Sequence, residues 1–138
     1  MAKKRSKKKS VGVGAKKPTD AELAILSVIW DCGSATVREV HEVLSRDSET
    51  GPTTVLKHMQ IMVEKGLLKK DASVRPQVFA AAIPRERTQE QMLGHVLDGA
   101  FSGSPGNLVL QALSMRETSA EELAQIRKML DELDGGAS

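Results

Sequence analysis

The sequence of 138 residues has one cysteine, three aromatic residues and no tyrosine. The lone Cys32 excludes an intramolecular disulfide framework and a multi-thiolate metal site, and it fits a reducing compartment. The shortage of aromatic side chains argues against proteins that stack single-stranded bases on aromatic platforms. No apolar run approaches the roughly 18 residues of a membrane span, so we expect a cytoplasmic protein without membrane insertion.

Motifs of catalytic and cofactor sites are also missing. His41, His58 and His95 fall in three different predicted helices, and no His-Glu-x-x-His pair or second cysteine completes a metal site. The sequence has no nucleophile elbow, no phosphate loop and no dinucleotide-binding glycine motif. Cys32 has no basic neighbour in the sequence, and we expect a buried structural thiol there. The sequence predicts no enzyme, no cofactor and no metal.

Basic residues are concentrated at the start of the chain. Residues 1–17 contain eight lysine and arginine residues and no acidic residue, although the net charge of the whole chain is only +2. The basic run is not followed by the apolar stretch of a signal peptide. We expect residues 1–17 to form a disordered basic tail that binds nucleic acid or another polyanion, with a solvated tail of no function as the alternative.

Residues 18–84 carry the signals of three helices and a hairpin. Capping boxes at residues 19–22 and 36–39 open the first two helices, and Gly33 is placed to end the first. Pro52 occupies the first position of the third helix. The apolar residues expected on the inner faces of these helices are Leu23, Leu26, Ile29, Trp30, Val37, Val40, Leu44, Val55, Met59 and Met62.

Two short strands are expected after the third helix, at residues 67–71 and 77–83, joined by a polar loop. Three helices followed by a β-hairpin is the order of a winged helix-turn-helix domain. The predicted fold class is therefore mainly α with a small β-hairpin: a winged helix-turn-helix head over 18–84 and a C-terminal helical dimerisation region over 85–138.

Residues 85–138 are expected to form three further helices, the last of them opened by a capping box at Ser119 and ended by Gly135 and Gly136. So short a helical segment buries little of its own surface, so we expect a homodimer, with packing on the first domain as the alternative. The side chains expected at the dimer interface are Leu97, Phe101, Leu108, Leu113, Leu123, Ile126, Leu130 and Leu133.

DNA binding is the function that this order of elements favours. The second helix of a helix-turn-helix pair enters the major groove, where glutamine pairs with adenine, lysine with guanine, and threonine contacts thymine methyl groups. The residues expected at the DNA are Thr53, Thr54, Lys57 and Gln60 on the third helix, with Lys70 and Arg75 of the hairpin on phosphates. Ordinary solvated side chains are the alternative for each, and His58 is expected to pack against the core.

The sequence resembles the penicillinase-repressor family of bacterial transcription regulators, BlaI/MecI/CopY, over roughly residues 18–135. The strings that carry the resemblance are ELAILSVIW at 22–30, TTVLK at 53–57, EKGLL at 64–68, LVL at 108–110 and the helix at 121–133. The resemblance implies a dimeric repressor that binds a dyad operator in double-stranded DNA and is released through a sensor protease pathway. A winged-helix protein-interaction adaptor, whose basic tail binds nucleic acid nonspecifically, is the alternative function.

The sequence departs from this family at three places. His95-Val96 stands where family members are cleaved at an Asn-Phe bond, so the same protease signal is not carried over. The C-terminus lacks the cysteines of copper-responsive members. Leu56 and Ile61 stand where the recognition helix of the family often has arginines, so the operator sequence is not transferred either.

Overall fold

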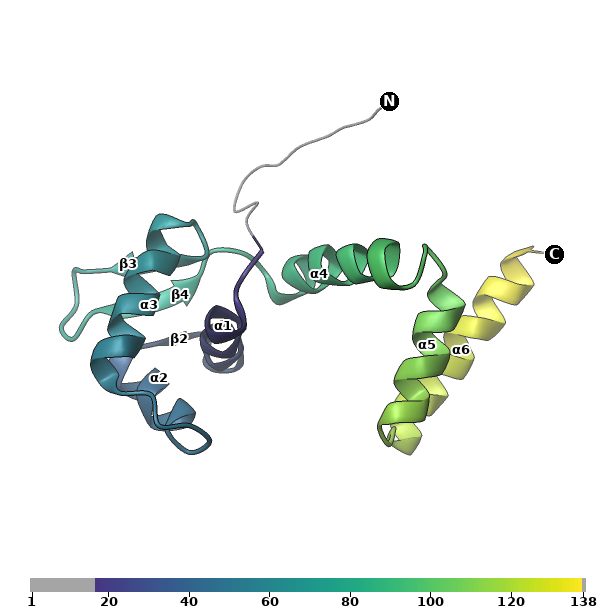
Figure 1. Cartoon of the computed structure of the whole chain (residues 1–138), viewed down its shortest axis with the longest axis horizontal. Coiled ribbons are helices and arrows are strands. Elements are labelled where there is room, and N and C mark those ends of the chain that lie inside the picture. Colours follow the sequence, from purple (N-terminus) through teal and green to yellow (C-terminus); the bar gives the residue numbers. More distant parts are fainter. Residues whose placement is uncertain (1–16, 138) are drawn as a thin grey trace, which may run out of the picture. The chain divides into compact units, whose positions relative to one another are not determined.

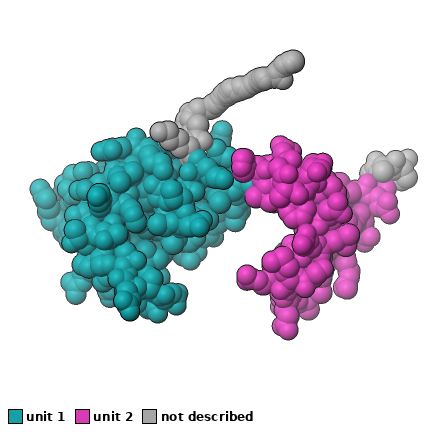
Figure 2. Space-filling view, in the orientation of Figure 1, with its two compact units in different colours: residues 1–92 teal, residues 93–138 magenta. Residues whose placement is uncertain are grey.

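The computed structural model describes residues 17–137 and divides the chain into two compact units (Figure 2). We call residues 1–92 the head and residues 93–138 the C-terminal unit. The predicted disordered tail lies outside the described residues except for Lys17.

The head consists of three helices and a three-stranded antiparallel sheet, which confirms the predicted winged helix (Figure 1). Its elements in chain order are α1 (Asp20–Cys32), β2 (Ser34–Ala35), α2 (Val37–Leu44), α3 (Pro52–Glu64), β3 (Leu68–Asp71) and β4 (Val78–Ala81).

Both predicted capping boxes are present at the helix starts. The Thr19 hydroxyl accepts a hydrogen bond from the Glu22 amide, and the Glu22 carboxylate accepts one from the Thr19 amide. Thr36 and Glu39 make the same reciprocal pair at the start of α2. Gly33 ends α1 with a φ of 87°, a backbone conformation that glycine adopts without steric cost.

The sheet has the strand order β2-β4-β3. β3 and β4 form the predicted hairpin, with Leu68 opposite Ala81 and Asp71 opposite Val78. Strand β2 was not predicted, because two residues are too short for an alternating pattern to show in the sequence. Ala35 of β2 lies opposite Phe79 of β4, so β2 joins the end of α1 to the hairpin.

The core lies where the three helices meet the sheet. Its buried apolar residues are Ile25, Leu26, Val28, Ile29, Ala35, Val40, Val55, Met59, Met62, Leu67, Leu68 and Phe79. Leu23, expected to be on the inner face of α1, is only half-buried. The expectation of a buried Cys32 is wrong: the thiol is exposed, because α1 ends at this residue and the chain turns away at Gly33.

Three helices follow the sheet: α4 (Arg85–Ala100), α5 (Pro105–Met115) and α6 (Ala120–Ala137). The Ser104 hydroxyl accepts a hydrogen bond from the Asn107 amide at the start of α5, and the Ser119 hydroxyl accepts one from the Glu122 amide at the start of α6. The expected stop at Gly135 and Gly136 is wrong, since α6 continues through both to Ala137. Glycine costs a helix about 1 kcal/mol relative to alanine, which weakens it without ending it.

The first turns of α4 belong to the head. The Trp30 indole N–H donates a hydrogen bond to the carbonyl oxygen of Ile83 at 3.1 Å, just before the helix. The Arg85 guanidinium lies 5.6 Å from the centre of the Trp30 ring and forms an ion pair with Asp31. Thr88, one turn further on, is buried. The division between the two compact units falls between residues 92 and 93, inside α4.

Candidate nucleic-acid interface

Helix α3 separates an apolar inner face from a polar outer face. Val55, Met59 and Met62 are fully buried, and their spacing of four and three residues places them on one side of the helix. The four residues of α3 expected to face DNA are all exposed: Thr53, Thr54, Lys57 and Gln60. His58 is half-buried.

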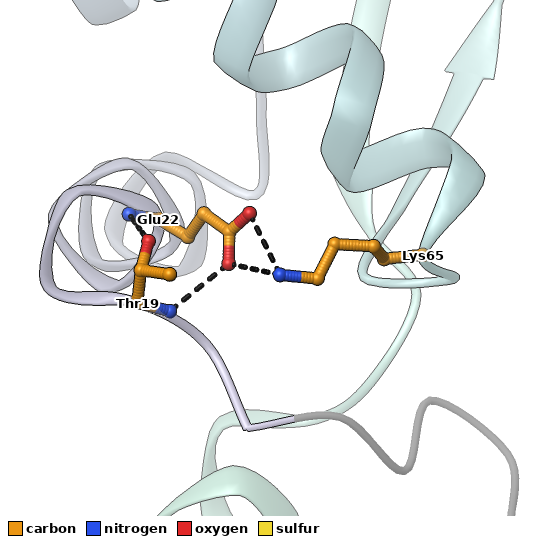
Figure 3. Close-up of polar contacts among 3 residues, drawn as sticks. All are labelled: Thr19, Glu22 and Lys65. Carbon is orange, nitrogen blue, oxygen red and sulfur yellow. Dashed lines mark hydrogen bonds and ion pairs between the residues drawn. The ribbon is translucent and has the colours of Figure 1, made fainter.

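Both ends of α3 are fixed in the head. At its start, Pro52 supplies the fixed φ of a first helical residue. At its end, the Lys65 ammonium contacts both carboxylate oxygens of Glu22, at 2.7 and 2.9 Å (Figure 3). Burial alone raises the pKa of Glu22, but hydrogen bonds from Lys65 and Thr19 outweigh it, so this pKa lies below its ordinary value. The ionised pair therefore joins α3 to the start of α1.

The hairpin presents its basic side chains to solvent. Lys69, Lys70 and Arg75 are all exposed. The turn before Arg75 is ordered by Asp71, whose carboxylate accepts hydrogen bonds from the hydroxyl and the amide of Ser73. These hydrogen bonds hold the pKa of Asp71 below its ordinary value.

A groove joins the hairpin to the starts of α2 and α3. Its charged and titratable lining residues are Arg38 and His41 from α2 and Arg75 from the hairpin, while Pro52 lies at its α3 side. Phe79 and Val37 are among the apolar residues that line it. The groove therefore brings the start of the candidate recognition helix next to two arginines from other elements.

Sequence reasoning missed Arg38 and His41 as candidate DNA contacts. The available signal was the position of Arg38 in the first turn of α2, because the first helix of a helix-turn-helix pair crosses the DNA backbone. The side chain of Arg38 is 90% exposed, and its 3.9 Å contact with Glu42 is too exposed to hold it firmly.

Charge is unevenly distributed between the two halves of residues 18–84. Residues 18–51 contain two basic and seven acidic residues, whereas residues 52–84 contain five basic and two acidic residues. The basic half comprises α3 and the hairpin, and in the view of Figure 1 the turn of the hairpin and α1 lie on opposite sides of α3. Residues 18–84 thus carry their excess of basic residues in α3 and the hairpin, although the net charge of this segment is −2.

The C-terminal unit has no core of its own among its described residues. None of residues 93–135 is buried. Of the residues expected at a dimer interface, Leu97, Phe101, Leu108, Leu123 and Ile126 are half-buried, and Leu113, Leu130 and Leu133 are exposed.

Over residues 17–137, no group of three or more histidine, cysteine, aspartate or glutamate side chains is arranged to hold a metal ion. Within the same range, none of the helices has the length and apolar character that crossing a membrane requires.

Three comparisons relate the chain to known proteins. A family model described as penicillinase repressor matches residues 18–132. The penicillinase repressor of Bacillus licheniformis is 28% identical to the chain over 114 residues, which cover 83% of this chain and 89% of that protein. The solution structure of the Bacillus licheniformis BlaI monomeric form in complex with the blaP half-operator is 32% identical. The matched region is 51% of this chain and 89% of the chain in that structure, and the TM-score is 0.45.

The family model spans most of the chain, from the residue before the capping box of α1 to near the end of α6. It includes the helices and hairpin of the head as well as the helices of the C-terminal unit. Its members are regulators rather than enzymes, in agreement with the expectation from the missing catalytic motifs. The chain therefore belongs to the penicillinase repressor family of DNA-binding transcriptional regulators.

Proposed function

We propose that the chain is a homodimeric repressor that binds a dyad operator in double-stranded DNA. In this proposal α3 enters the major groove, with Thr53, Thr54, Lys57 and Gln60 at base edges. Lys70 and Arg75 of the hairpin hold phosphates, and Arg38 joins them from the start of α2. A repressor of this kind acts on operator DNA inside the cell, so we expect it in the cytoplasm. Release through a sensor protease pathway stays a prediction.

The observation that carries the proposal is the meeting of three elements at one groove. Pro52 at the start of α3, Arg38 on α2 and Arg75 on the hairpin line it together. This arrangement fits a DNA-binding winged helix, because the recognition helix reads bases while neighbouring elements contact the DNA backbone. Pro52 at the groove directly precedes the exposed Thr53 and Thr54, and residues 52–84, which comprise α3 and the hairpin, contain five basic and two acidic residues.

The homodimer is supported by the apolar surface of the C-terminal unit. Most of the large hydrophobic side chains exposed in the described residues belong to this unit, among them Leu110, Met115, Leu130 and Leu133, each more than half exposed. Apolar surface of this extent on a small helical unit marks an interaction site, and burying it against a second copy would give each unit the core it lacks.

The proposal is tested by selecting binding sequences from random duplex DNA at about 0.15 M salt, where weak electrostatic attachment is screened. The full chain and a variant lacking residues 1–17 are compared. We expect both to recover the same inverted repeat, with half-site centres about one or two helical turns apart. The truncated chain should bind more weakly at low salt, because the tail adds phosphate contacts without sequence preference.

Recovery of no preferred sequence by either protein would contradict operator recognition and favour the adaptor function. Recovery of an unpaired half-site, together with a monomeric mass in solution, would contradict the dimer while leaving base reading by α3 intact.

A further inference from the structure

We propose that Leu56 and Ile61 are specificity residues that recognise the C5-methyl groups of thymine in the operator. The inference rests on the proposed function, because it requires α3 to lie in the major groove. It assigns a binding role to two side chains that the polar set Thr53, Thr54, Lys57 and Gln60 does not include.

Leu56 and Ile61 are much more exposed than the residues of α3 that belong to the core. Leu56 is 38% exposed and Ile61 is 37% exposed, whereas Val55, Met59 and Met62 on the same helix are 0% exposed. The inner face of α3 is therefore complete without them, and neither is needed to fill the core.

Each apolar side chain lies beside polar residues of the outer face. Leu56 is three residues after Thr53 and four before Gln60, so the three form adjacent positions on the helix surface. Ile61 is likewise four residues after Lys57. Around the helix, Leu56 thus borders the polar face next to Gln60, and Ile61 lies within it between Lys57 and Thr54, so a groove that receives this face also meets both.

The major groove offers one apolar feature to such side chains, the thymine methyl group. An A·T pair presents the adenine N7 and N6 groups and the thymine methyl on the same major-groove edge. A glutamine paired with adenine therefore brings its helical neighbours close to that thymine or to the next one. Gln60 and Leu56 have the spacing to read both parts of such a pair, the first by hydrogen bonds and the second by apolar contact.

The test removes only the methyl group. With the full chain, each thymine in one half-site of the selected operator is replaced in turn by deoxyuridine, which keeps the base pair and its hydrogen-bonding groups. Wild type is expected to lose about fourfold in affinity at one or more positions, the effect of about 0.8 kcal/mol for one buried methyl. Leu56→Ala should lose a similar factor on the thymine operator and show no further loss with deoxyuridine at the position Leu56 contacts.

The affinity of Ile61→Ala is measured on the same operators. This variant should show no loss of affinity from deoxyuridine at a thymine different from the one that Leu56 contacts. Val74→Ala is the matched control, because Val74 is 43% exposed and lies in the turn between β3 and β4 instead of on α3. This variant should keep every deoxyuridine effect of wild type. Circular dichroism checks that each variant is folded.

The inference is overturned if no thymine in the selected half-site responds to deoxyuridine, or if both variants on α3 keep the full response. A selected half-site without thymine would also overturn it, while leaving operator recognition by α3 in place. Recovery of no preferred sequence would overturn the proposed function and this inference together.

Discussion

Glu22 and Lys65 join the start of α1 to the end of α3 through a nearly buried carboxylate. The Glu22 carboxylate accepts a hydrogen bond from the Thr19 amide at 2.9 Å and contacts the Lys65 ammonium at 2.7 and 2.9 Å (Figure 3). The side chain of Glu22 is only 6% exposed. One side chain therefore caps the first helix and fixes the end of the helix that we propose reads DNA.

We expect Glu22→Gln to lower the free energy of unfolding by about 2 kcal/mol at pH 7, since a charged hydrogen-bonded partner is lost from a nearly buried pair. The folded-state pKa of Glu22 is lowered, so its ionised form stabilises the fold above the unfolded pKa. This stabilisation is lost as the pH falls through the folded-state pKa. The difference between variant and wild type in urea unfolding should therefore shrink below about pH 4.

The matched control for this substitution is Glu39→Gln. Glu39 occupies the same capping-box position at the start of α2, but it is exposed and has no ion pair in the described part of the chain. Its substitution should cost less than about 1 kcal/mol. Equal losses of unfolding free energy for Glu22→Gln and Glu39→Gln would show that the ion pair with Lys65 adds no stability.

Shortening a side chain should lower the free energy of unfolding much more on the inner face of α3 than on its outer face. Met59→Ala is expected to cost about 2–5 kcal/mol of unfolding free energy, because it leaves a cavity at a fully buried position. Leu56→Ala, three residues earlier, should change stability by less than about 0.5 kcal/mol. Urea unfolding of both variants measures the difference, and a large loss for Leu56→Ala would place this side chain in the core.

The contacts among Trp30, Asp31 and Arg85 should protect the first turns of α4 from local opening. They should contribute little to the free energy of unfolding of the whole head. We expect Arg85→Ala to raise amide hydrogen exchange over residues 85–92 while lowering the unfolding free energy by no more than about 1 kcal/mol, since the ion pair is exposed. Arg87→Ala, at an exposed position of the same helix, is the control. Unchanged exchange in Arg85→Ala would show that buried Thr88 and the Trp30 hydrogen bond suffice.

Residues proposed to hold phosphates and residues proposed to read bases should differ in their response to salt. Lys70→Ala and Arg75→Ala are each expected to reduce the slope of log affinity against log salt by about 0.9, with equal losses on specific and random DNA. Gln60→Ala should keep the slope and lose about 1–3 kcal/mol of discrimination at one base pair. Lys128→Ala on α6 is the control, and titrations at several salt concentrations measure all four variants.

The proposed dimer interface should be sensitive to charge. Leu130→Glu and Leu133→Glu introduce a charge at exposed apolar positions of α6, and we expect each to weaken dimerisation at least about tenfold, because the lost apolar burial is of the order of 1.5–3 kcal/mol. Gln125→Glu adds the same charge at an exposed polar position and should have little effect. Sedimentation over a range of concentrations measures the dissociation constant, and an undisturbed dimer in both leucine variants would contradict this interface.

The sequence by itself determined where most elements begin and which side of each helix is buried. Capping boxes at Thr19 and Thr36 and the proline at position 52 are local signals, and helix starts depend on local hydrogen bonds and backbone geometry. The apolar spacing of Val55, Met59 and Met62 likewise fixed the inner face of α3 and left its polar residues outside. The resemblance to the penicillinase-repressor family was also visible in the sequence, in strings such as those at residues 22–30, 53–57 and 64–68.

Only the tertiary structure decided the contacts between elements distant in sequence. The pairing of Glu22 with Lys65, the hydrogen bond from Trp30 to Ile83 and the groove shared by Arg38 and Arg75 depend on how helices and sheet pack, which no local pattern records. The exposure of Cys32 and Leu56 has the same origin. Whether a side chain is buried depends on what packs against it, and an apolar residue at the end of a helix or the border of its inner face finds no partner there.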